Sequence, residues 1–151
     1  MAAHRIIFSN ACLHSFSDPG APDSFHVQLT GLTIRGGQVT VDIVTADGRN
    51  IYHEKFAAHE LLSDVEHLTP KQEEDHIRQR IAHFFDKDAF EMPALGQNEV
   101  FDGDYVNKDD WEDIHSNRSA IGFHFLRGSE YDLFIAYSRK KRKAVPYSAC
   151  C

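Results

Sequence analysis

The sequence predicts an α+β fold, because β-type alternation fills the first third of the chain, a helical pattern follows, and β-type segments return near the C-terminus. The chain has 151 residues, of which 42% are hydrophobic and 26% are charged, and this composition suits one folded domain with a hydrophobic core. We expect an antiparallel sheet, made of an N-terminal meander and a C-terminal hairpin, packed against one main helix. A long acidic loop should precede the last hairpin.

Strand-like segments in the first part of the chain predict the meander. Residues 4–16 form a short apolar run, and residues 25–29 and 39–43 alternate between apolar and polar side chains. A period of two is typical of strands with one buried face. Asp47-Gly48 is a strong hairpin signal, because glycine accepts a positive φ without penalty, and it predicts a further strand directly after it.

A start signal and an apolar stripe predict the main helix. Thr69 and Gln72 have the spacing of a capping box, and Pro70 occupies the first helical position, where proline is favoured. The helix should run to about residue 85, because apolar residues recur at helical spacing. These residues are Ile77, Ile81, Phe84 and Phe85.

Residues 119–126 and 131–138 read as the two strands of the C-terminal hairpin. Both segments carry several large apolar side chains, so we expect the hairpin to be central to the fold. The side chains expected to point into the core are Ile121, Phe123, Phe125, Leu133 and Ile135.

Charge is distributed unevenly along the chain. The formal net charge is −7, but five of the 16 basic residues are consecutive at 139–143, so residues 1–138 carry 11 basic against 23 acidic residues. We expect one domain over residues 1–138 and a flexible basic tail over residues 139–151, since consecutive like charges repel and stay solvated. The acidic body should repel nucleic acid and favour a basic protein partner.

Cysteine usage and hydropathy predict a cytoplasmic protein. No apolar run approaches the roughly 20 residues of a membrane-spanning helix, and the N-terminus does not resemble a signal peptide. The three cysteines are an odd number and two of them are adjacent, so no disulfide framework is implied. Cys150-Cys151 after a basic run resembles the doubly prenylated end of small GTPases of the Rab type, although no phosphate-binding loop accompanies it. The sequence leaves homo-oligomerisation open.

The acidic segment 101–118 has three interpretations: a cation site, a docking surface for a basic partner, or a solvated loop. It lacks the glycine and the glutamate that an EF-hand needs at the sixth and twelfth loop positions, so we expect no metal. Trp111 would anchor a docked partner, or else close over the core and hold the loop in place. The residues predicted to bind a partner are Asp102, Asp104, Asp109, Asp110, Trp111, Glu112 and Asp113.

Histidines offer a second kind of site, because the chain contains ten. His26, Asp42, His53 and His124 lie at polar strand positions that would converge on a pocket if the sheet curled, and histidine is a common general base. The alternative is that they are solvated side chains on the wet face of a sheet. The chain contains no H-E-x-x-H, no G-x-S-x-G, no Gly-rich phosphate loop and no dinucleotide fingerprint, so we expect no cofactor.

These observations favour a small, acidic, non-catalytic binding or regulatory protein, of the immunity or chaperone kind, that docks a basic partner. The alternative is a small-molecule-binding domain or an enzyme that uses a sheet face lined by His and Asp. A closed apolar pocket with convergent His and Asp would favour the alternative, whereas a flat wet face with a protruding acidic loop would favour docking.

Overall fold

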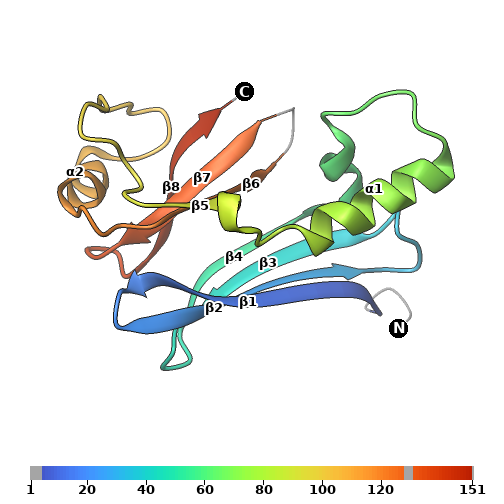
Figure 1. Cartoon of the computed structure of the whole chain (residues 1–151), viewed down its shortest axis with the longest axis horizontal. Coiled ribbons are helices and arrows are strands. Elements are labelled where there is room, and N and C mark those ends of the chain that lie inside the picture. The colour runs from blue at the N-terminus through green and yellow to red at the C-terminus, as the bar shows by residue number, and fades with distance from the viewer. Residues whose placement is uncertain (1–4, 128–130, 151) are drawn as a thin grey trace.

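The computed structural model describes residues 5–127 and 131–150, and its strands form two four-stranded antiparallel sheets (Figure 1). The first sheet contains β1 (Ile6–Asp18), β2 (Ala21–Thr30), β3 (Gln38–Val44) and β4 (Asn50–Ala57), paired in chain order. The second contains β5 (Phe90–Glu91), β6 (Gly122–Leu126), β7 (Asp132–Ser138) and β8 (Lys143–Cys150), also in chain order. The predicted α+β fold, with its meander and C-terminal hairpin, is confirmed, and the strands divide between two sheets.

The alternation of apolar and polar residues along the strands determines which side chains of the first sheet are buried. Phe25, Val27 and Leu29 on β2 are fully buried, whereas His26 between them is exposed. Val41 of β3 lies opposite Val27, so the two strands place apolar side chains on the same face. Gly48, in the turn between β3 and β4, has a φ of 91°, which a side chain would disfavour.

The main helix α1 (Pro70–Ala82) begins with the predicted capping box. Gln72 N donates to Thr69 Oγ1 at 3.2 Å, and Thr69 N donates to Gln72 Oε1 at 2.9 Å. The helix ends at Ala82, three residues earlier than predicted, and the side chain of Asn10 on β1 donates to the carbonyl groups of Ile81 and Ala82. These bonds help satisfy the carbonyl groups at the helix end, where the Ile81 oxygen also accepts from Phe84 N at 3.2 Å.

Two short 3₁₀ helices flank α1, one before it (η2, Ala58–Leu62) and one after it (η3, Lys87–Ala89). Across the described part of the chain, no helix combines the length and the apolar character needed to cross a bilayer.

The main hydrophobic core lies where the second sheet and α1 cover one face of the first sheet (Figure 1). Phe123 of β6 is fully buried at its centre, with its ring centroid 5.3 Å from Phe25 of β2 and 5.0 Å from Phe90 of β5. Its ring also contacts Phe84 and Phe85, which follow α1. One aromatic side chain therefore connects both sheets and the segment after the helix.

A second, smaller core lies between the second sheet and helix α2 (Lys108–Ser116). Its buried residues include Val106, Ile114, Ala136, Val145 and Tyr147. The acidic segment therefore contains a helix, where the sequence predicted a loop without regular structure.

The segment expected to be a flexible tail is in large part a strand. Residues 143–150 form β8, which pairs with β7 from Ser138↔Lys143 to Asp132↔Cys150. Ala144, Val145 and Tyr147 of β8 are buried, and this apolar burial holds the strand on the sheet. Most of the basic run therefore lies in the turn between β7 and β8. Cys151 lies outside the described residues.

We expect Phe123→Ala to lower the free energy of unfolding by about 3–5 kcal/mol, because truncating a fully buried Phe removes apolar contacts and leaves a cavity. Phe101→Ala is the matched control, since its side chain is 38% exposed. Denaturant unfolding of both variants measures the difference. A loss below about 1 kcal/mol for Phe123→Ala would contradict its place in the core.

Gly122→Ala should also destabilise the fold, by about 1–3 kcal/mol, because overpacking strains a closed core. A Cβ at this buried position would lie 2.3 Å from Tyr147 Oη. Removing that oxygen should relieve the clash, so Tyr147→Phe combined with Gly122→Ala should cost less than the sum of the two single changes. Additive unfolding free energies would show that the contact is not the source of strain.

Candidate functional site

The acidic segment becomes a helix because its residues suit a helix N-terminus. The side chain of Asn107 caps α2 and accepts a hydrogen bond from Asp110 N at 2.8 Å. Asp109 and Asp110 follow in the first turn, where carboxylates interact favourably with the helix dipole. Part of the acid cluster therefore has a structural explanation.

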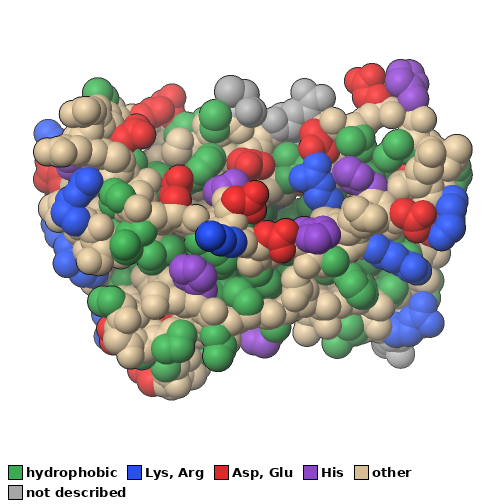
Figure 2. Space-filling view, viewed as in Figure 1, with side chains coloured by type: hydrophobic (Ala, Val, Ile, Leu, Met, Phe, Trp, Pro, Cys, Tyr) green, Lys and Arg blue, Asp and Glu red, His purple; other side chains and the backbone are tan. Residues whose placement is uncertain are grey.

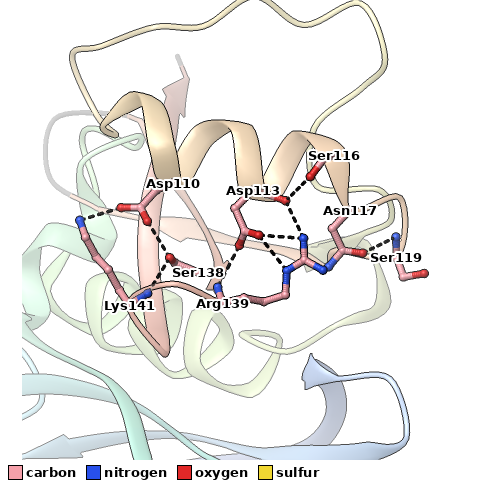
Figure 3. Close-up of polar contacts among 8 residues, drawn as sticks. All are labelled: Asp110, Asp113, Ser116, Asn117, Ser119, Ser138, Arg139 and Lys141. Atoms are coloured by element: carbon pink, nitrogen blue, oxygen red, sulfur yellow. Dashed lines mark hydrogen bonds and ion pairs between the residues drawn. The ribbon is translucent and has the colours of Figure 1, made fainter.

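Two of the predicted partner-binding residues are used inside the molecule (Figure 3). Asp110 is 2% exposed; Ser138 Oγ donates to its Oδ1 at 2.6 Å, and Lys141 Nζ lies 2.6 Å from its Oδ2. Asp113 accepts from the backbone N of Arg139 at 2.9 Å and from its Nε at 2.8 Å. We call these five residues the α2 clasp. It joins α2 to the β7–β8 turn through acids and bases that are distant in sequence.

The clasp holds Asp110 in its charged form. Burial alone would raise the pKa of this carboxyl group, but hydrogen bonds from Lys141 and Ser138, together with the Lys141 charge, hold its pKa below the ordinary value. The ordered turn residues therefore neutralise a buried carboxylate that would otherwise be costly.

The other predicted carboxylates remain in solvent. Asp102, Asp104, Asp109 and Glu112 are exposed, and the same holds for Glu99. Within the part of the chain that the structure describes, no ion pair joins any of these five to a cation. The segment 96–107 rises on the side of α2 away from the clasp (Figure 3).

Apolar side chains are interspersed with these acids. Val100 is 82% exposed and Tyr105 is 42% exposed, whereas Trp111 is half-buried. The Trp111 ring stacks on His115 with centroids 4.5 Å apart, and Phe101 meets it edge-on at 5.9 Å. Trp111 also packs on the second core, so its ring holds the segment against α2. We call the exposed residues of 99–112, together with Trp111, the acidic–aromatic surface.

Three of the four candidate histidine-site residues lie side by side. His26, Asp42 and His53 are cross-strand neighbours on β2, β3 and β4. His53 Nδ1 lies 2.7 Å from Asp42 Oδ1, which also accepts from Asn50 Nδ2 at 3.1 Å. The imidazoles of His26 and His53 are both exposed, so this group lies on an open, wet sheet face.

His124 lies elsewhere, on β6 of the second sheet. Its Nδ1 is 3.0 Å from Asp132 Oδ2, and its Nε2 is 3.0 Å from the backbone carbonyl oxygen of Asp88. Both ring nitrogens of His124 therefore have a partner within the protein.

His124 lines a groove that the sequence did not indicate. The groove lies between α1, η3 and β6. It is also lined by His76 and Arg80 of α1 and by His83, which directly follows the helix. Their spacing of three to four residues places them on one side of the helix, and that spacing was the available sequence signal. Sequence reasoning missed them because nothing in the chain indicates which strand faces this side of α1.

Comparisons with protein-family models, with curated proteins and with solved structures found no match for this chain. Among residues 5–127 and 131–150, no group of three or more His, Cys, Asp or Glu side chains is arranged to hold a metal ion.

We expect Asp110→Asn to lower the free energy of unfolding at pH 7 by about 1–3 kcal/mol, because it removes a buried charge and leaves Lys141 without its partner. Since folding lowers the pKa of Asp110, its stabilising contribution is present above about pH 4 and is lost as the pH falls through the folded-state value. The difference between parent and variant should therefore shrink as the pH falls from about 5 toward 2.

Asp109→Asn is the control for this experiment. Asp109 is adjacent to Asp110, but its side chain is exposed and forms no ion pair within the described chain. It should change the free energy of unfolding by less than about 0.5 kcal/mol at either pH. Equal effects of the two substitutions, measured by denaturant unfolding, would contradict the clasp.

Proposed function

We propose that this protein is a non-catalytic binding protein that docks a basic partner on the acidic–aromatic surface. The observation that supports it is the combination, in one segment, of exposed Val100, Phe101 and Tyr105 with five exposed carboxylates that no ion pair joins to a cation among the described residues. Carboxylates attract lysine and arginine and accelerate association, whereas apolar and aromatic side chains slow dissociation once they are covered.

The charge and apolar pattern together define the partner. A partner segment that carries lysine or arginine beside apolar side chains would satisfy both features of this surface. The clasp supports the proposal indirectly, because Arg139 and Lys141 are held beneath α2 by Asp113 and Asp110. The segment 96–107, which carries the exposed Glu99, Asp102 and Asp104, rises on the other side of the helix (Figure 3).

The alternative, a catalytic site on the first sheet, has weaker support than docking. His26, Asp42 and His53 occupy an exposed sheet face, where water competes for every polar contact. His124, the fourth candidate, has both ring nitrogens engaged.

A triple substitution tests the docking surface: Asp104→Asn, Asp109→Asn and Glu112→Gln. The matched control removes three acids at the α1 end of the molecule, through Glu66→Gln, Glu74→Gln and Asp75→Asn, and so has the same net charge. The parent, the surface variant and the control are each used for affinity capture from native cells. Quantitative mass spectrometry then identifies proteins that the parent and the control capture but the surface variant does not.

The association rate of such a protein should then fall at least about tenfold for the surface variant at low salt, near 0.02 M, and the difference should shrink near 0.3 M, where charges are screened. The control should associate like the parent. Both triple variants should unfold within about 0.5 kcal/mol of the parent, since surface changes rarely cost more. The proposal fails if the captured protein binds the surface variant as fast as the parent at low salt, or if the control loses it equally.

A further inference from the structure

A groove about 390 Å³ in volume lies between α1, η3 and the edge of β6, on the face shown in Figure 2. It forms because β5 pairs with β6 only at Phe123 and Gly122. Beyond that point, His124, Phe125 and Leu126 line the groove, and α1 and η3 form its other walls. Figure 2 shows histidine and acidic side chains gathered over the end of α1 and the segment that follows it.

The floor of the groove is apolar. It is lined by Leu61, Phe84, Ala89, Phe125 and Leu126, all of them buried. The rings of Phe84 and Phe125 lie 5.5 Å apart, so the floor includes an aromatic pair. A hydrocarbon or aromatic ligand body would pack on these side chains, and the volume lies within the range of small-molecule sites.

The rim on the α1 side carries nitrogen donors. His76, Gln79, Arg80 and His83 line it. The guanidinium of Arg80 pairs with Asp64, and its Nε donates to His76 Nε2 at 3.2 Å. Two neighbours therefore fix Arg80 beside the groove through its Nε and Nη2, and among the described residues no hydrogen bond takes up its Nη1, which can donate to a ligand carboxylate.

Two carboxylates also line the groove, those of Asp88 on η3 and Asp132 on β7. Asp132 is bonded to His124, whose Nδ1 lies 3.0 Å from its Oδ2. Because Asp132 and the Asp88 carbonyl contact both nitrogens of His124, this ring is a fixed wall of the groove.

We infer that the groove binds a small organic acid, with its carboxylate at Arg80 on the α1 rim and its apolar body on Phe84 and Phe125. This site is separate from the acidic–aromatic surface and does not depend on the docking proposal. Its test uses only this protein and small-molecule probes, and does not require a partner protein to be identified.

The test uses two probes that share one apolar body: 4-phenylbutyrate and its neutral amide. Two-dimensional ¹H–¹⁵N NMR titration of the full chain gives each dissociation constant and locates the binding. We expect 4-phenylbutyrate to bind in the millimolar range or tighter, with saturable shifts in α1, η3 and β6. The amide should bind at least about tenfold more weakly, because it lacks the charge that Arg80 recognises.

Arg80→Gln should weaken 4-phenylbutyrate at least about tenfold and leave the amide unchanged. Arg78→Gln is the matched control, because Arg78 is exposed on the same helix and does not line the groove. His83→Gln is a second variant in case Arg80→Gln disturbs the fold, which its NMR spectrum would reveal, and it should weaken the acid more than the amide.

The inference is overturned by the absence of saturable shifts at about 10 mM 4-phenylbutyrate, or by shifts located outside α1, η3 and β6. Equal affinity for the acid and the amide would also overturn it, as would an equal effect of Arg80→Gln and Arg78→Gln.

Discussion

The packing of Phe123 against Phe25 is the contact on which the rest of the structure depends. The two rings come from different sheets, lie 5.3 Å apart and are fully buried. Neither four-stranded sheet has a second layer of its own on this face, so each needs the other, together with α1, to remove its apolar side from water. Both candidate surfaces are consequences of this arrangement, because the groove forms where α1 meets the edge of the second sheet and α2 covers that sheet's opposite face.

The α2 clasp shows why charge counted along a sequence overstates the charge that a partner meets. Asp110 and Asp113 contribute to the acidic segment, and Lys141 and Arg139 contribute to the basic run, yet in the fold they neutralise one another. A buried pair of this kind adds little net stability compared with apolar packing, but breaking it is costly, so it fixes the position of α2 more than it strengthens the fold. What remains for recognition is the set of carboxylates that the clasp leaves in solvent.

Local signals made most of the fold predictable. The alternation of Phe25, Val27 and Leu29 and the capping box at Thr69 depend on neighbouring residues only, and both appear in the structure as expected. Helix α2 was missed because one of its buried positions is an aspartate. Val106, Asp110 and Ile114 recur every four residues, but Asp110 reads as solvated until its partners on the β7–β8 turn are known. The strand β8 was missed for the related reason that five cations precede its apolar residues.

The candidate sites were less predictable, because they depend on which elements meet. The register of the meander places His26, Asp42 and His53 in one row, and alternation alone indicated their shared face. No local pattern tells that His124 lies across from α1 in the other sheet. The same limit applies to the engaged and the exposed acids, since Asp109 and Asp110 are adjacent in sequence but opposite in role. A helix turns about 100° per residue, so one of the two carboxylates faces the β7–β8 turn and the other faces water. Their difference follows from which side of α2 the second sheet occupies, and that is a property of the tertiary fold.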